Sequence, residues 1–264
     1  MLIRPPDYAY TTYADCLSNT AVEGMALEKN GNFGTLASGE PVAVPAPAQT
    51  MMRDLHNHGS RMLAYAAEKY NISRNLKDYI FVPVSVFFND LPNRNAVGFP
   101  LSQLTEFNPE YGCLGYETWK FKPAFQDHKN DDYTQARGMI FDVALRRNDR
   151  YEGEPHQLWH LLGYDRNRFK VLCNEILNRE RTGYSMGAWV ADYRCSICDA
   201  SSKGGGCEHV ANGQPGSMRV WAMQDGSKKI GYLQSQRPVG FECSTVKSPA
   251  FFGGVNPNYL LLRS

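Results

Sequence analysis

The sequence lacks a long apolar run and an excess of charge of one sign, and its first residues do not predict a signal peptide. No stretch approaches the roughly 18 consecutive apolar residues that a membrane-spanning helix needs. The first residues, MLIRPPDYAY, contain no apolar core of signal-peptide length. The formal net charge is +1, so no overall field attracts nucleic acid or an anionic membrane. We therefore expect a soluble, unexported protein, with no specific nucleic acid and no membrane among its partners.

The composition provides ample material for a folded core. Of the 264 residues, 42% are hydrophobic and 12% are aromatic, while the charged fraction of 21% is ordinary for a soluble protein. No internal repeat divides the chain, so we expect one core domain with appendages. The predicted parts are an extended N-terminal arm (1–50), a helical lead-in (51–78), a β domain (79–255) and a C-terminal tail (256–264).

Most of the predicted β domain has the pattern of strands. The run YIFVPVSVFF at 79–88 is β-branched and aromatic and is followed by polar residues, so it predicts a buried strand despite Pro83. Further strands are predicted at 137–146, 184–193, 217–223, 229–234 and 239–246. Helices are predicted at 51–70 and 168–180, where apolar residues recur at helical spacing. Mainly strands with flanking helices indicate an α+β fold containing a small, closed or partly closed β-barrel.

Ser185 is the first candidate for chemistry. It lies in GYSMGAWV on a predicted strand, with Gly183 and Gly187 on either side. Glycines permit close approach and unusual dihedral angles, and small neighbours would leave room for a substrate backbone. Taken alone, a serine between glycines is usually an ordinary strand or turn serine.

His128, in KPAFQDHKN, is the second candidate. A serine hydroxyl is a weak nucleophile near neutral pH and needs an adjacent imidazole that a third group orients. His128 follows an apolar stretch and precedes a polar turn, which makes it the best placed base. The alternative is a surface histidine at a strand end.

Glu242, in GFECSTVKSPAF, is the third candidate. Strand periodicity puts Glu242 and Ser244 on one face. A carboxylate there could accept the second ring N–H of a catalytic histidine and stabilise the imidazolium. The alternative is a partly exposed carboxylate on a strand.

Together, the three segments resemble the prohead (head-maturation) proteases of tailed bacteriophages, which are similar in fold to herpesvirus assemblins. That family places a histidine first, then S-[IM]-G-[FA] on a strand, then E-x-S-x-V-x-x-P-A. Here the order is His128, then the segment 185–188 (SMGA), then the segment 242–250 (ECSTVKSPA). The likeness covers about 79 to 255. Two departures are Ala188, where many members have an aromatic residue, and Glu242, where assemblins use a second histidine.

The resemblance implies a serine endopeptidase with Ser185 as nucleophile, His128 as base and Glu242 as the orienting group. Its substrates would be the phage scaffold and major capsid proteins, and self-processing is implied as well. It would act in the host cytoplasm, inside the phage prohead or virion. A homo-oligomer is left open.

A separate segment, RCSICDASSKGGGCEHV, has the spacing of a metal site. It holds C-x-x-C, an eight-residue connection and C-x-H, so it offers Cys195, Cys198, Cys207 and His209. Three thiolates and an imidazole form a tetrahedral set suited to zinc. Four protein ligands leave no position for water, so we expect a structural zinc in a hairpin inserted at 194–212. The alternative is a flexible hairpin with incidental thiols.

Two histidine patterns offer weaker alternatives. In HQLWH, His156 and His160 are four residues apart, but the glutamate of an H-E-x-x-H metalloprotease is missing. The segment LHNHG (55–59) lies in the predicted helix 51–70 without a nuclease pattern around it.

Two other functional classes therefore remain open beside the serine endopeptidase. One is a zinc-dependent hydrolase that uses His156 and His160. The other is a non-catalytic virion structural or scaffold-associated protein that keeps the protease fold and a structural zinc site.

Overall fold

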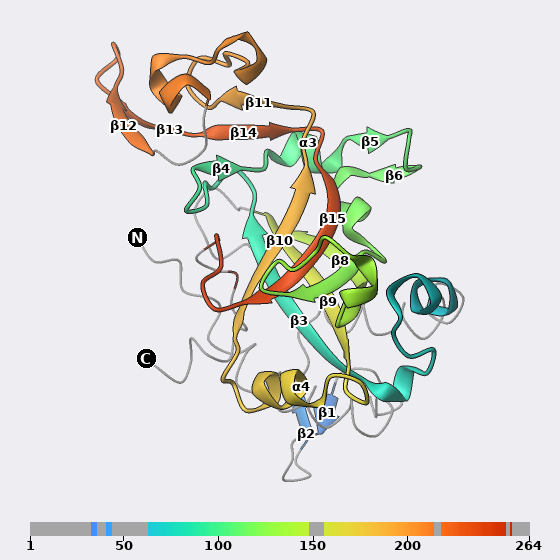
Figure 1. Ribbon diagram of the computed structural model, residues 1–264. Coiled ribbons are helices and arrows are strands. Elements are labelled where there is room, and N and C mark those ends of the chain that lie inside the picture. The colour runs from blue at the N-terminus through green and yellow to red at the C-terminus, as the bar shows by residue number, and fades with distance from the viewer. Residues whose placement is uncertain are drawn as a thin grey trace.

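The computed structural model describes residues 33–35, 41–43, 63–147, 156–213, 218–251 and 254 (Figure 1). Within the predicted N-terminal arm it contains β1 (Phe33–Thr35) and β2 (Pro41–Ala43), which pair antiparallel. The segment 63–70 of the predicted lead-in is helical. The LHNHG motif and the predicted tail 256–264 lie outside the described residues. No helix in the described part of the chain is long and apolar enough to cross a membrane.

A six-stranded sheet forms the centre of the molecule. Its strands, in spatial order, are β10 (Gly183–Trp189), β15 (Val239–Val246), β7 (Pro123–Gln126), β8 (Gly138–Arg147), β9 (His156–Asp165) and β3 (Tyr79–Phe88). Neighbours run antiparallel, except that β15 and β7 are parallel. The sheet is curled into a half-barrel (Figure 1), and its two edge strands, β10 and β3, approach each other. A mainly β protein with a few helices and a partly closed sheet is confirmed.

The core lies within the curl of this sheet. All ten residues of β3 are buried, and the ring of Phe141 packs edge-on against Tyr79 at 5.2 Å and against Phe81 at 5.0 Å. Pro83 fits in β3 because this strand is the last in the sheet, where a missing amide hydrogen is tolerated. The strand predicted at 79–88 is therefore correct.

Two predicted strands are each split in the structure. The strand predicted at 184–193 ends as β10 at Trp189 and resumes as β11 (Asp192–Cys195), and that at 229–234 divides into β13 (Lys228–Gly231) and β14 (Leu233–Gln236). β11 pairs with β14, and β14 pairs on its other side with β4 (Val97–Gly98), in a second sheet. The chain turns between the sheets at Arg237, whose φ of 48° is left-handed.

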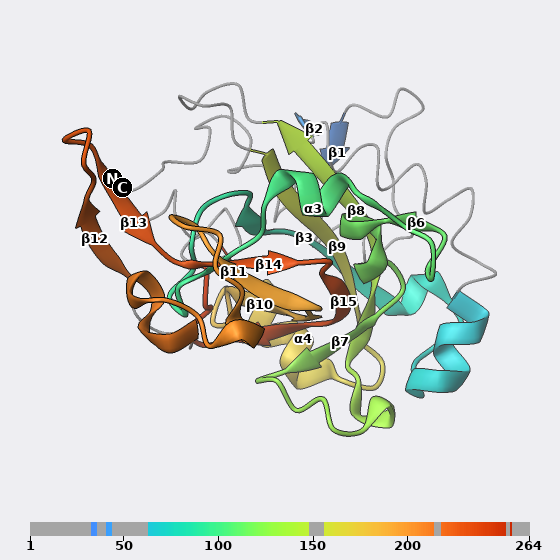
Figure 2. The same cartoon turned by 90° about the horizontal axis from the view of Figure 1, so that it is seen from above.

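The remaining elements flank the two sheets. The helix predicted at 168–180 is α4 (Lys170–Leu177), at the opposite end of the molecule from the hairpin formed by β12 (Arg219–Ala222) and β13 (Figure 1). The view from above shows this hairpin projecting beyond the six-stranded sheet (Figure 2). The other short elements are η1 (Leu76–Asp78), α3 (Leu101–Thr105), β5 (Phe107–Asn108), β6 (Cys113–Leu114), η2 (Gly115–Trp119), η3 (Tyr133–Gln135), η4 (Ser202–Gly204) and η5 (Glu208–Gly213).

Candidate functional site

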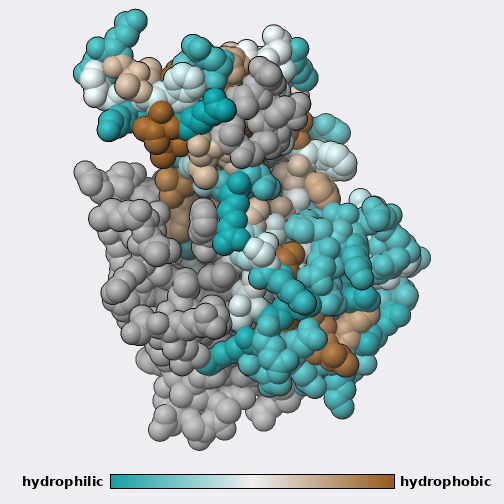
Figure 3. All heavy atoms as spheres, turned by 60° about the vertical axis from the view of Figure 1, so that its left-hand side comes forward, coloured by the Kyte–Doolittle hydropathy of each residue, from teal (hydrophilic) through white to brown (hydrophobic). Residues whose placement is uncertain are grey.

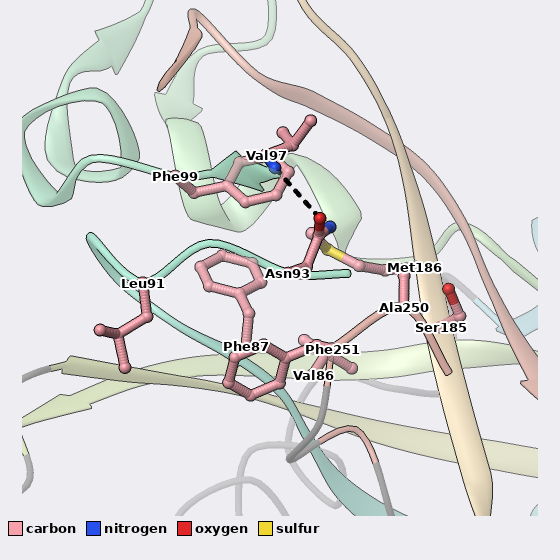
Figure 4. Close-up of a pocket in the computed structure, with 10 residues that line it drawn as sticks. All are labelled: Val86, Phe87, Leu91, Asn93, Val97, Phe99, Ser185, Met186, Ala250 and Phe251. Carbon is pink, nitrogen blue, oxygen red and sulfur yellow. Dashed lines mark hydrogen bonds between the residues drawn. The ribbon is translucent and has the colours of Figure 1, made fainter. Parts of the chain in front are cut away.

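Ser185 lies in the middle of β10, and its strand neighbours define the site. In the ladder with β15, Ser185 is opposite Ser244 and Gly187 is opposite Glu242. Residues directly opposite each other in antiparallel strands share a face of the sheet. Figure 4 shows the side chain of Met186 turned toward a small apolar pocket, while the Ser185 hydroxyl lies on the other side of the strand. Ser185, Ser244 and Glu242 therefore gather on one face of β10 and β15.

Gly187 has a different role from the one predicted for it. A Cβ atom at Gly187 would lie 2.7 Å from Oε1 of Glu242 and 2.4 Å from a ring atom of Phe241. Both distances are shorter than real side chains allow, so the absence of a side chain gives the Glu242 carboxylate its place. The sequence suggested that this glycine makes room for a substrate. In the structure it makes room for a neighbouring acid.

Glu242 is fully buried and connects two other polar side chains. The Ser244 hydroxyl donates a hydrogen bond to Oε2 at 2.6 Å, and Nδ1 of His128 lies 3.0 Å from Oε1. The exposed fraction of Glu242 is 0%, so it is not a partly exposed strand carboxylate. A buried carboxylate with a partner on each oxygen is held in one orientation.

His128 reaches Glu242 from a tight turn after β7. The turn begins where the Asp127 amide donates to the Thr245 carbonyl at 2.9 Å. Asp127 and His128 each have a φ of 54°, in the left-handed region that non-glycine residues seldom adopt. Asp and His are among the residue types that adopt this conformation most often, and two in succession turn the chain sharply, so that the His128 side chain lies against β15.

The contact with Glu242 also affects the pKa of His128 and determines which of its ring nitrogens stays free. The hydrogen bond to Glu242 raises the pKa of His128, burial opposes that effect, and the charges of Glu242 and Asp127 add to it. Because Nδ1 faces the carboxylate, Nε2 is the nitrogen left to exchange a proton. The imidazole is 44% exposed, so a reactant can reach it.

The sequence did not indicate two of the contacts that support this site. The Ser244 hydroxyl bond to Glu242 needs the side-chain orientation, although strand periodicity already put both residues on one face. The indole Nε1 of Trp119 donates to the Gly187 carbonyl at 3.0 Å, and Trp119 is itself fully buried. Trp119 lies 68 residues from Gly187 in the chain, so no local pattern could reveal this contact.

The predicted metal ligands converge. The ligand atoms of Cys195, Cys198, Cys207 and His209 all lie within 4.8 Å of one another. Nδ1 of His209 lies 3.3 Å from the Cys198 sulfur, and the Ile197 amide donates to the Cys195 sulfur at 3.3 Å. Such a cluster could bind a metal ion.

Polar contacts hold the loop that carries these ligands. Asp192 accepts hydrogen bonds from the Ser201 and Ser202 hydroxyls at 2.6 and 2.9 Å. The indole of Trp221, on β12, packs edge-on against the His209 imidazole at 4.8 Å and donates to the His209 carbonyl. The sequence did not predict that the β12–β13 hairpin covers the cluster, because the contact depends on how the hairpin folds back.

The thiols of the cluster have different acidities. The Ala200 amide is the main cause that lowers the pKa of Cys198, to about 7, and the bond to His209 adds to it. Burial raises the pKa of Cys207 to about 11. A bound cation would deprotonate both, because a coordinating thiol loses its proton to the metal. This donor set fits a thiophilic metal ion such as zinc.

The HQLWH histidines lie in a strand and do not form a site. His156 and His160 belong to β9, where four residues span about 13 Å. His160 is fully buried opposite Val84 and Val143, and neither ring nitrogen has a hydrogen-bond partner among the described residues. Burial lowers the pKa of His160 to about 3, so its ring stays neutral. The zinc-hydrolase hypothesis therefore gains no support from this pair.

No protein-family model, no curated protein and no solved structure matches this chain.

Proposed function

We propose that this protein is a serine endopeptidase of the prohead-maturation type, which cleaves scaffold and major capsid proteins as a phage head matures and also processes itself. One observation carries the proposal. The buried Glu242 carboxylate faces Nδ1 of His128. Glu242 belongs to β15, the strand that pairs with β10, and Ser185 of β10 lies on the same face of the sheet.

The proposed chemistry is acyl transfer. The Ser185 hydroxyl attacks the scissile carbonyl while Nε2 of His128 accepts its proton. His128 then gives that proton to the leaving amine. In the second half of the reaction, water attacks the acyl-enzyme, Nε2 of His128 accepts the proton of the water, and His128 returns it to the Ser185 oxygen as the acid product leaves. Glu242 keeps Nδ1 protonated and stabilises the imidazolium that forms. Backbone amides would stabilise the oxyanion.

The surface near β10 suits a polypeptide substrate. An open cleft of about 820 Å³ lies at the end of β10 away from Gly183, and Trp189, Phe107 and Tyr111 are among its lining residues. Ser185, His128 and Glu242 do not line it, so it would receive substrate residues several positions away from the scissile bond. These three aromatic side chains are 69%, 59% and 43% exposed. A cleft of this size is large enough for several side chains of an extended chain.

We further propose that the Cys3His cluster holds a structural zinc ion. Cys195, Cys198, Cys207 and His209 would supply all four ligands, leaving no open position for water or substrate. The metal would fix the loop of the predicted hairpin 194–212 and would take no part in peptide hydrolysis. The chain's own residues 128, 185 and 242 carry the chemistry.

The decisive test is co-expression of the chain with the scaffold and capsid proteins of its own phage. Wild type, Ser185→Ala and a control variant, Ser102→Ala in an exposed turn of α3, would be compared by intact-mass spectrometry. We expect cleavage products and self-processed termini with the wild type and with Ser102→Ala, and none with Ser185→Ala. Identical masses in all three samples, from folded protein, would overturn the serine mechanism.

A second candidate function is a non-catalytic virion structural or scaffold-associated role. It is favoured by the apolar residues on the projecting β12–β13 hairpin, where Val220 and Ile230 pair across the ladder and are 66% and 48% exposed. The space-filling view shows apolar atoms among hydrophilic ones on the upper, projecting part of the molecule (Figure 3). Unchanged processing in the Ser185→Ala sample would favour this role.

A further inference from the structure

Arg181 joins three segments of the chain around the candidate site. It lies between α4 and β10, four residues before Ser185, and only 9% of it is exposed. Its Nη1 donates to Oδ1 of Asp127 at 2.8 Å, and its Nε donates to Oε2 of Glu175 at 3.1 Å. A buried guanidinium held by two carboxylates has a fixed orientation.

One of these carboxylates belongs to the turn that carries His128. Asp127 directly precedes His128, and both residues have the left-handed φ of 54°. Two successive left-handed residues make a tight turn, and the position of such a turn depends on the contacts that hold it to the rest of the fold. The described contacts of Asp127 are its backbone bond to Thr245 and its side-chain bond to Arg181.

We propose that Arg181 is a positioning residue that holds the Asp127–His128 turn in register with the Ser185 strand. This inference rests on the proposed function, because it assigns the turn a catalytic histidine. The guanidinium fixes Asp127 relative to β10, and the left-handed backbone then directs the His128 ring toward Glu242. Lysine would keep the charge but could not reproduce the two-directional contact.

A purely structural ion pair is the alternative, and the two roles predict different results. The acidic groups that act on the His128 ring are Glu242 and Asp127. The effect of Arg181 would reach His128 through the position of the turn. Loss of Arg181 should therefore weaken the bond between His128 and Glu242, whereas a structural pair would change only the stability of the fold.

The first test measures His128 directly and needs no enzyme activity. The imidazole pKa of His128 would be followed by NMR in inactive Ser185→Ala protein, alone and combined with Arg181→Met, Arg181→Lys or Arg74→Met. Arg74 is the control, since its guanidinium is 70% exposed and pairs at 3.8 Å with Glu68. We expect the His128 pKa to fall toward its ordinary value in Arg181→Met, to fall less in Arg181→Lys and to stay unchanged in Arg74→Met. An unchanged His128 pKa in folded Arg181→Met would overturn the proposal.

Asp127→Asn provides the same test if Arg181→Met does not fold. This substitution weakens the contact between Arg181 and Asp127 at Asp127, whose side chain is 38% exposed. It leaves the bond between Arg181 and Glu175 intact. Asparagine tolerates the left-handed backbone. Because the Asp127 charge itself raises the pKa of His128, the readout for this variant is the downfield NMR signal of the proton between Nδ1 of His128 and Glu242. We expect this signal to weaken or disappear, and an unchanged signal in folded Asp127→Asn would count against the proposal.

The second test uses the active protein. We expect Arg181→Met to lower kcat by about 10- to 100-fold with little change in KM, since a small misplacement of a catalytic group has effects of this size. The acid limb of the pH–rate profile should move to lower pH, because a base with a lower pKa stays deprotonated further into acid. Ethylguanidinium should restore part of kcat in Arg181→Ala, and urea at the same concentration should not. A normal kcat and pH profile in Arg181→Met would contradict the proposal.

The two tests separate the failure of this inference from failure of the proposed function. If the wild type cleaves nothing, the proposed function fails, and the NMR titration still decides whether Arg181 positions His128. If the wild type is active and Arg181→Met behaves like the control, only the positioning role fails.

Discussion

The six-stranded sheet and the metal-cluster region are ordered by different forces. Every residue of β3 is buried, whereas the first three residues of β13 are exposed and β12 contains no buried residue. The sheet encloses an aromatic core, while the loop after Cys195 relies on hydroxyl and thiol contacts to Asp192 and His209. The two candidate sites therefore depend on separate sources of stability. We expect that a substitution or treatment can disrupt either site and leave the other intact.

The largest expected effect comes from a substitution in the six-stranded sheet and should leave the metal cluster unchanged. Glu242→Gln keeps the shape of the side chain but removes the charge that faces Nδ1 of His128. We expect kcat to fall by about 10²-fold or more, because the imidazolium loses its stabilising partner. The acid limb of the pH–rate profile should shift down with the pKa of His128.

Metal content provides the control for this variant. Inductively coupled plasma mass spectrometry should find the same metal in Glu242→Gln as in the wild type, since Glu242 takes no part in the cluster. A loss of metal together with activity would contradict the independence of the two regions.

Metal removal should destabilise the metal-cluster region and leave the six-stranded sheet unchanged. We expect a strong chelator, or Cys198→Ser, to increase hydrogen exchange across 194–212 and the β12–β13 hairpin, because a metal held by four side chains of this loop would cross-link it. Exchange in β3, β8 and β9 should stay slow. Hydrogen-exchange mass spectrometry checks both statements in one experiment, with Cys113→Ser as the matched thiol control. Equal loss of protection in both regions would show that the sheet also depends on the metal.

A smaller effect is expected from Gly187→Ala. The new methyl group would meet Glu242 and Phe241 at 2.7 and 2.4 Å, so one of them must move. We expect a loss of about 1–3 kcal/mol in the free energy of unfolding, the usual cost of overpacking, and a fall in kcat. Urea denaturation measures the first and peptide hydrolysis the second. Gly204→Ala is the control, because nothing lies within 4 Å of a Cβ atom there. Equal stabilities of the two variants would mean that Glu242 does not need the space at Gly187.

The smallest effect is a pH dependence of stability. The bond to Glu242 raises the pKa of His128 above its ordinary value of 6.5. A raised pKa in the folded state means that the folded protein binds the proton more tightly than the unfolded chain does. This contribution is complete below pH 6.5 and disappears as the pH rises through the folded pKa. Urea midpoints measured across this range should fall less with pH in His128→Gln than in the wild type, and parallel curves would exclude the contribution.

The sequence predicted best what depends on local pattern. The strands at 79–88 and 239–246 follow from runs of β-branched and aromatic residues, and the ligand set follows from the spacing of C-x-x-C and C-x-H within one short segment. The proximity of His128 to Glu242 was expected only because the three motifs resemble those of a known family.

The rest depends on tertiary contacts. The break between β10 and β11 arises because the chain leaves the six-stranded sheet and pairs with β14 in the second sheet from Asp192 onward. The burial of Glu242 needs a glycine on the opposite strand, and the contact between Asp127 and Arg181 joins residues 54 apart in sequence. No period or propensity within one segment contains these relations.

Pro83 has a consequence that concerns the chain before it folds. The ten residues of the run YIFVPVSVFF are all buried, and eight of them belong to the hydrophobic core. An uncharged, β-branched and aromatic segment of this kind readily pairs with copies of itself while it is exposed. Proline offers no amide hydrogen and interrupts such intermolecular ladders. We therefore expect Pro83, which counts against a strand in the sequence, to limit the aggregation of newly made chains.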